Sequence, residues 1–187
     1  MKGFDDIASE RLILRLLPRE ALLATAAGDV ASVSRGLALA VAPTWSDVAS
    51  LARRRLAQLE TDPDYVPWGI RAIALRSAGE VVGYVNFHAS PGSEDLRKYT
   101  PRAVELGYTV FAEHRRQGYA GETARAMMKW ALARKADGFV FSISPGNLPS
   151  LALVRRFNGV KVGSQIDEED GPEDIYFVRP ENIGQPA

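Results

Sequence analysis

The chain has 187 residues, of which 46% are hydrophobic and 25% are charged, and its 23 basic residues balance 23 acidic ones. This length and apolar content predict one ordinary hydrophobic core, and therefore a single domain over residues 1–187. A net charge of zero provides no global basic field, which argues against a nucleic-acid partner. The absence of cysteine excludes disulfides, thiolate metal ligands and cysteine nucleophiles.

The N-terminal segment Met1-Lys2-Gly3-Phe4-Asp5-Asp6 is acidic where a signal peptide would be basic and then apolar. No apolar run reaches the roughly 18 residues that a membrane span needs. We therefore expect a soluble cytoplasmic protein without a membrane partner. Whether it is a monomer or a homodimer stays open.

The first elements are predicted from periodicity. Residues 11–16 alternate charged and apolar side chains, as in a half-buried strand. Residues 19–60 are rich in Ala and Leu and predict two or three short helices, the last capped by Ser46 or Asp47. We expect the arginines at positions 53–55 to project mostly to solvent.

The remaining elements predict a mixed sheet. Residues 68–76 and 81–88 form two strand-like runs joined by a short turn, which indicates a β-hairpin. Residues 104–111 have apolar side chains at both parities, as in a central strand covered on both faces. We expect further elements at 122–134 (helix), 139–143 (strand), 149–157 (helix), 160–166 (strand) and 175–178 (strand). This order is typical of an α/β fold of about seven strands with helices on both faces.

A short basic turn separates the central strand from the long helix. Its residues are Arg115, Arg116, Gln117, Gly118, Tyr119 and Ala120. Unpaired backbone N–H groups and the positive end of the helix dipole meet there, so the turn is a candidate phosphate site. Gly118 permits close approach of a ligand, although a plain structural turn would look the same. Neither a P-loop lysine motif nor a Gly-x-Gly-x-x-Gly motif is present, which argues against an NTPase or a dinucleotide dehydrogenase.

At this turn the chain resembles the GNAT superfamily of acetyl-CoA-dependent N-acetyltransferases. The signature is Arg115-x-x-Gly118-x-Ala120, preceded by the strand at 105–111. The segments 10–15 and 143–150 resemble the same family, so the resemblance covers about 9–180. It is nearest to the branch that includes ribosomal-protein alanine N-acetyltransferases. The resemblance implies acetyl-CoA as co-substrate, no metal, and a mostly antiparallel sheet in which the fourth and fifth strands are parallel and splayed.

The resemblance also assigns cofactor-binding positions. The backbone at Tyr108 and Val110 would meet the pantetheine amides, and the N–H groups from Arg115 to Ala120 would hold the pyrophosphate. Asn147 would hydrogen-bond the pantetheine arm. This is physically reasonable, because an extended ligand with regularly spaced amides can complete an open strand edge. Without the resemblance, Asn147 is simply a turn residue.

Two residues are candidates for the chemistry. Acetyl transfer needs a neutral amine, and an alkylamine with a pKa of about 10 is mostly protonated at neutral pH, so a base is required. Glu105 is the candidate, because it is a carboxylate in an apolar central strand where burial would raise its pKa. Pairing with Arg102 is the structural alternative. Ser150 is assigned to the departing thiolate, since this chain has no tyrosine on the helix where many relatives carry one; Ser150 as a helix-start residue is the alternative.

Other charged groups have weaker assignments. His88 ends the hairpin and is a candidate second base, whereas His114 is expected to pack or to face solvent. Two histidines without cysteine and without a His-Glu-x-x-His pattern do not make a metal site. The acids at 167–170, with Glu173 and Asp174, are expected to lie in the connection between the last two strands. They either form a solvated turn or attract a cationic amine.

Three functions fit these patterns. The first is an N-acetyltransferase that moves the acetyl group to a primary amine, of a protein N-terminus or a small molecule, by direct attack in a ternary complex. The second is a non-catalytic acetyl-CoA-binding regulatory module, and the third is an interaction domain that uses the helices of residues 19–60. The acceptor is not fixed by the sequence, because specificity depends on loops.

Overall fold

The computed structural model describes residues 6–167 and 171–184. By its internal contacts the chain divides into two compact units. Unit 1 comprises residues 1–87 and 108–126, and unit 2 comprises residues 88–107 and 127–187. The strand β5 (Ala103–Val110) and the helix α4 (Tyr119–Leu132) each run through both units.

The sheet is mixed, as the sequence predicts. Its strand order is β1-β2-β3-β4-β5-β6-β8-β7, with β5 parallel to β6. The strands of unit 1 are β1 (Ile7–Ala8), β2 (Leu12–Leu16), β3 (Arg71–Leu75) and β4 (Val81–Phe87). Those of unit 2 are β6 (Gly138–Ile143), β7 (Val160–Asp167) and β8 (Gly171–Val178). The described residues thus hold eight strands where about seven were expected; β1 is the strand that periodicity missed, because two residues are too few to show a period.

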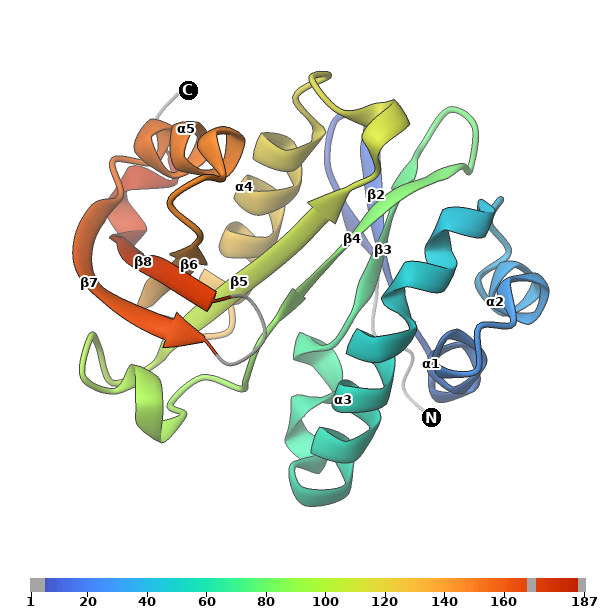
Figure 1. Cartoon of the computed structure of the whole chain (residues 1–187), viewed down its shortest axis with the longest axis horizontal. Coiled ribbons are helices and arrows are strands. Elements are labelled where there is room, and N and C mark those ends of the chain that lie inside the picture. Colours follow the sequence, from blue (N-terminus) through green and yellow to red (C-terminus); the bar gives the residue numbers. More distant parts are fainter. Residues whose placement is uncertain (1–5, 168–170, 185–187) are drawn as a thin grey trace. The chain divides into compact units, whose positions relative to one another are not determined.

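Helices cover the sheet in unit 1. They are α1 (Arg19–Ala26), α2 (Val30–Leu37), η1 (Pro43–Val48), α3 (Ala49–Thr61) and η2 (Pro63–Trp68). Figure 1 shows α1, α2 and α3 gathered on one side of β2, β3 and β4. Their apolar faces share one core with the strands, in which Leu22, Val33, Trp45, Ala72 and Val81 are all buried. Burial of such side chains drives the packing of this layer.

One expectation about these helices was wrong, and another is confirmed only in part. Ser46 and Asp47 do not cap α3, because both lie inside the 3-10 helix η1, and α3 begins after Val48 without a side-chain cap. Arg53 and Arg54 are exposed, as expected, but Arg55 is only 7% exposed, and its Nε donates to Asn86 Oδ1 at 3.0 Å. Its guanidinium also lies 5.6 Å from the centre of the Tyr65 ring. The hydrogen bond to Asn86 on β4 therefore keeps Arg55 buried, although the charge pattern of the helix predicts exposure.

Unit 2 carries the C-terminal elements. Its helical segments are η3 (Glu94–Leu96), the second part of α4, α5 (Leu148–Arg156) and η5 (Pro180–Asn182). A small core joins Leu96, Ala103, Val140 and Ile175, with Tyr99 stacked on Phe177. The strand β8 pairs antiparallel with both β6 and β7. This arrangement fixes the start of β5 beside β6.

Candidate functional site

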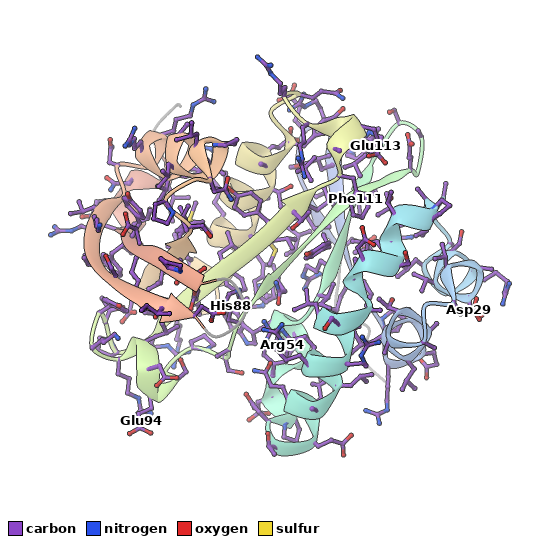
Figure 2. All side chains as sticks on the ribbon, in the orientation of Figure 1. Asp29, Arg54, His88, Glu94, Phe111 and Glu113 are labelled. Carbon is purple, nitrogen blue, oxygen red and sulfur yellow. The ribbon has the colours of Figure 1, made fainter. Side chains whose placement is uncertain are left out.

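The end of β5 is held tightly against β4. The Phe111 N–H donates to the Val82 carbonyl at 2.9 Å, and Phe111, labelled in Figure 2, packs edge to face on Trp45 at 6.3 Å between ring centres. A Cβ atom on Gly83 would stand 2.1 Å from the Thr109 carbonyl oxygen. Only glycine fits at that distance. The backbone of the predicted pantetheine-binding residues is therefore fixed by a close approach, with Val110 buried and Tyr108 half-buried.

The parallel ladder between β5 and β6 is short. It pairs Ala103 with Gly138, Val104 with Phe139 and Glu105 with Val140. Both strands continue beyond the last pair, β5 to Val110 and β6 to Ile143. The ladder thus stops partway along both strands, as in the splayed pair that the family resemblance implies.

The predicted phosphate turn lies in unit 1, between the 3-10 helix η4 (Ala112–His114) and α4. Arg116 and Gly118 have φ angles of 62° and 83°, so two residues with left-handed φ lie just before the helix. Such residues next to a helix start turn successive N–H groups toward one side, which makes an anion-binding concavity. The Arg115 Nε donates to the Val110 carbonyl at 3.0 Å and ties the turn to β5.

Two residues that contact this turn were not predicted from the sequence as part of the site. Arg11 and Glu122 form an ion pair of 2.7 Å between Nε and Oε2, and the guanidinium of Arg11 lies 4.8 Å from the centre of the Tyr119 ring. The Tyr119 hydroxyl and Gln117 Oε1 are 3.1 Å apart. Arg11 precedes β2, far from the turn in the sequence, so no local pattern indicates the contact.

Glu105 and His88 form a pair within unit 2. The His88 Nδ1 lies 3.5 Å from Glu105 Oε1, and the His88 N–H donates to the Glu105 carbonyl at 2.9 Å. The Glu105 side chain is 17% exposed and that of His88 is 43% exposed. Arg102, the partner considered from the sequence, donates instead to the carbonyls of Lys135 and Arg134. The structure therefore places a histidine beside the candidate base.

Asn147 is the N-cap of α5. Its Oδ1 accepts a hydrogen bond from the Ser150 N–H at 3.3 Å, so both residues take part in starting the helix. Asn147 is exposed and Ser150 is half-buried. The cap uses only the carbonyl oxygen of the Asn147 amide, and the Asn147 amide nitrogen is a further donor. The predicted hydrogen bond to a pantetheine arm would therefore use a different atom from the cap.

The acidic run differs from its predicted place. Glu173 and Asp174 lie in β8 rather than in the connection, Asp167 ends β7, and positions 168–170 lie outside the described residues. Hydrogen bonds from Lys161 and Ser164 lower the pKa of the Asp174 carboxyl. Gln165 Nε2 donates to Glu173 Oε2 at 3.0 Å. These two carboxylates thus contact side chains of the neighbouring strand β7.

Comparison with known families decides the class of the protein. Residues 11–159 match the family model of the acetyltransferase (GNAT) domain. The chain belongs to the GNAT acetyltransferase family. It is accordingly an acyltransferase, and the co-substrate of this family is acetyl-CoA. A comparison with curated proteins found no match.

Solved GNAT structures share the fold of this chain. One is a putative ribosomal-protein-serine acetyltransferase from Vibrio cholerae, with 19% identity, a TM-score of 0.64, and coverage of 96% of this chain and 100% of the other. Another is an acetyltransferase from Agrobacterium tumefaciens, with 24% identity, a TM-score of 0.60, and 96% of each chain covered. A third is RimL, a ribosomal L7/L12 alpha-N-protein acetyltransferase in complex with coenzyme A, with 19% identity, a TM-score of 0.62, and 94% and 98% covered. At these identities the likeness extends to the fold alone.

The described part of this GNAT protein contains neither a metal-binding cluster nor a membrane-spanning helix. Within 6–167 and 171–184, no three His, Asp or Glu side chains are grouped so that they could hold a metal ion. Over the same ranges, no helix is both long and apolar enough to cross a membrane.

Proposed function

We propose that this GNAT protein moves the acetyl group of acetyl-CoA to a primary amine, either of a protein N-terminus or of a small molecule. The observation that carries the proposal is the left-handed turn of Arg116 and Gly118 at the start of α4, within the matched family segment. A protein N-terminus is supported by the fold shared with RimL, a ribosomal L7/L12 alpha-N-protein acetyltransferase. We propose that residues 1–187 act as one such domain in the cytoplasm, as a monomer or a homodimer.

The turn and the end of β5 fit acetyl-CoA. The N–H groups of residues 115–120 would hold the pyrophosphate, with Arg115 and Arg116 adding positive charge. The backbone of Tyr108 and Val110 would meet the pantetheine amides, and the Asn147 amide nitrogen would hydrogen-bond the same arm. Support comes from the close packing of Gly83 on β4 against Thr109 and Val110 on β5. A backbone that is already held in place loses little conformational entropy when the ligand binds.

Glu105 is proposed to take the proton of the attacking amine. Bound acetyl-CoA supplies the activated thioester, and the amine attacks it directly without a covalent enzyme intermediate. His88, 3.5 Å from the carboxylate, would pass the proton on toward solvent, since it is the more exposed of the two. The Val110 N–H would stabilise the oxyanion, and Ser150 would donate a hydrogen bond to the departing thiolate.

The second candidate is a regulatory module that binds acetyl-CoA without turnover. The observation that favours it is the sequence of α5, Leu-Pro-Ser-Leu-Ala-Leu-Val-Arg-Arg, which contains no tyrosine to protonate the thiolate. Both candidates predict binding of acetyl-CoA. They differ because only the enzyme releases CoA when an amine is added.

The test compares Glu105→Gln with wild-type protein in a CoA-release assay. Peptides with a free N-terminus and small amines serve as acceptors, and Glu94→Gln is the control, because Glu94 is an exposed acid of the same unit (Figure 2). Loss of a general base lowers kcat by roughly a hundredfold or more. We expect that loss for Glu105→Gln at unchanged affinity for acetyl-CoA, and none for Glu94→Gln. An unchanged kcat of Glu105→Gln refutes the assigned base, and binding without CoA release for every acceptor favours the regulatory module.

A further inference from the structure

Arg11 contacts the phosphate turn at three points, although the two segments are more than a hundred positions apart. Its Nε donates to Glu122 Oε2 at 2.7 Å and its Nη1 donates to the Gln117 carbonyl at 2.9 Å. The same guanidinium covers the Tyr119 ring. These contacts reach the Gln117–Gly118 peptide of the turn and the first turn of α4, all within unit 1.

Glu122 is the anchor for this arginine. Its Oε1 accepts hydrogen bonds from the Ser9 hydroxyl and from the Arg11 backbone N–H, both at 2.7 Å. Both carboxylate oxygens are thus engaged, one by the backbone and Ser9 and the other by the guanidinium. Since the carboxylate is fixed from two sides, the guanidinium has a defined direction toward Gln117.

The bond to the Gln117 carbonyl determines where the next N–H points. In a planar trans peptide the C=O and the following N–H point in opposite directions. Holding the Gln117 oxygen on Arg11 therefore directs the Gly118 N–H away from Arg11. Gly118 tolerates either orientation of this peptide because it has no side chain, so the orientation depends on the bond to Arg11.

Charge supports the same role. Glu122 lies in the first turn of α4, where the helix dipole attracts anions. An unpaired carboxylate there would repel a phosphate. The guanidinium of Arg11 compensates that charge at 2.7 Å and so keeps the helix start suitable for a bound anion.

We propose that Arg11 is a positioning residue that orients the Gln117–Gly118 peptide for the pyrophosphate of acetyl-CoA, with Ser9 and Glu122 fixing its direction. This rests on the proposed function, because it assigns Arg11 to the same cofactor turn.

The test is Arg11→Gln with two acetyl donors. Acetyl-CoA carries the phosphates, whereas acetyl-pantetheine has the same thioester arm without them. A charge-assisted hydrogen bond is worth roughly a tenfold to hundredfold change in affinity. We expect KM for acetyl-CoA to rise by about that factor, with kcat/KM for acetyl-pantetheine within about twofold of wild type. Arg11→Lys should recover only part of the loss, because an ammonium cannot bond Glu122 and the Gln117 carbonyl in the same planar geometry.

Arg15→Gln is the matched control. Arg15 lies in β2, pairs with Asp6 at 2.7 Å and donates to the Leu37 carbonyl. It should lose similar stability without changing the preference between donors. An equal loss with both donors for Arg11→Gln, or none with either, overturns the inference, and Arg11→Lys repeats the comparison if the glutamine variant does not fold. Failure of wild-type protein to bind acetyl-CoA would instead refute the proposed function.

Discussion

The close contact between β4 and β5 gives a sharp prediction for Gly83→Ala. The new Cβ would lie 2.1 Å from the Thr109 carbonyl oxygen and 3.0 Å from the Val110 Cα. Real Cβ contacts are essentially never shorter than 3.0 Å, so the backbone at Thr109 must move away by at least 0.9 Å. Both neighbours are backbone atoms of a strand, which cannot rotate aside as a side chain can.

This displacement should lower both stability and the rate of acetyl transfer. Overpacking of this kind costs about 1–3 kcal/mol, and a misplacement of roughly 1 Å at reacting groups costs about a hundredfold in rate. We expect kcat/KM for acetyl-CoA to fall by about that factor, because the Val110 N–H moves with Thr109. The assay is CoA release, with the unfolding temperature measured in parallel.

Gly163→Ala is the control for this prediction, because a Cβ at Gly163 would have nothing within 4 Å. It should leave both activity and unfolding temperature unchanged. A Gly83→Ala protein with wild-type kcat/KM would refute the reasoning, since it would mean that the Val110 backbone can move without consequence for acetyl transfer.

Three further predictions concern stability. Burial alone would raise the pKa of the Glu122 carboxyl, but the hydrogen bonds from Arg11 and Ser9 lower it below the ordinary 4.5. The stabilisation of the folded state by the charged Glu122 carboxylate is therefore complete above pH 4.5 and is lost as the pH falls through the lowered pKa. Glu122→Gln should accordingly lose less stability than wild type between neutral and acidic pH in urea titrations, and parallel curves would contradict this. Lys135 has a φ of 68° after α4, so Lys135→Gly should raise the unfolding temperature by about 2–4 °C, for roughly 1 kcal/mol gained, and a fall would oppose this. Asn86→Leu removes an acceptor of the buried Arg55 and should cost about 1–3 kcal/mol in chemical unfolding, whereas an equally stable variant would refute that estimate.

The sequence predicts the local elements of the site well. The strand of residues 104–111, the turn and the helix after it are confirmed within a few residues, because their apolar pattern and the glycine of the turn are local signals. The hairpin is also confirmed, although its first strand begins at Arg71 rather than at Trp68. Trp68 instead ends a 3-10 helix that begins at Pro63, a residue that favours the first turn of a helix.

Contacts between distant segments could not be predicted in this way. Arg11 looks like one residue of an alternating strand pattern, and only the fold brings it to Gln117 and Glu122. Likewise, Arg55 belongs to an arginine triplet on a helix, and its burial depends on Asn86 of β4. The pairing of His88 with Glu105 depends on the path of the chain between β4 and β5. In each case the partner is defined by tertiary structure, which periodicity does not encode.

Calorimetric titration of acetyl-CoA into wild-type protein and into Gly118→Trp tests whether the turn before α4 binds acetyl-CoA. Gly118 has a φ of 83°, and a Cβ there would meet Arg11 Nη2 at 3.3 Å, so an indole would obstruct the turn and strain its backbone. We predict micromolar binding by the wild type and none by a folded Gly118→Trp variant. A folded wild-type protein that does not bind acetyl-CoA would contradict the account.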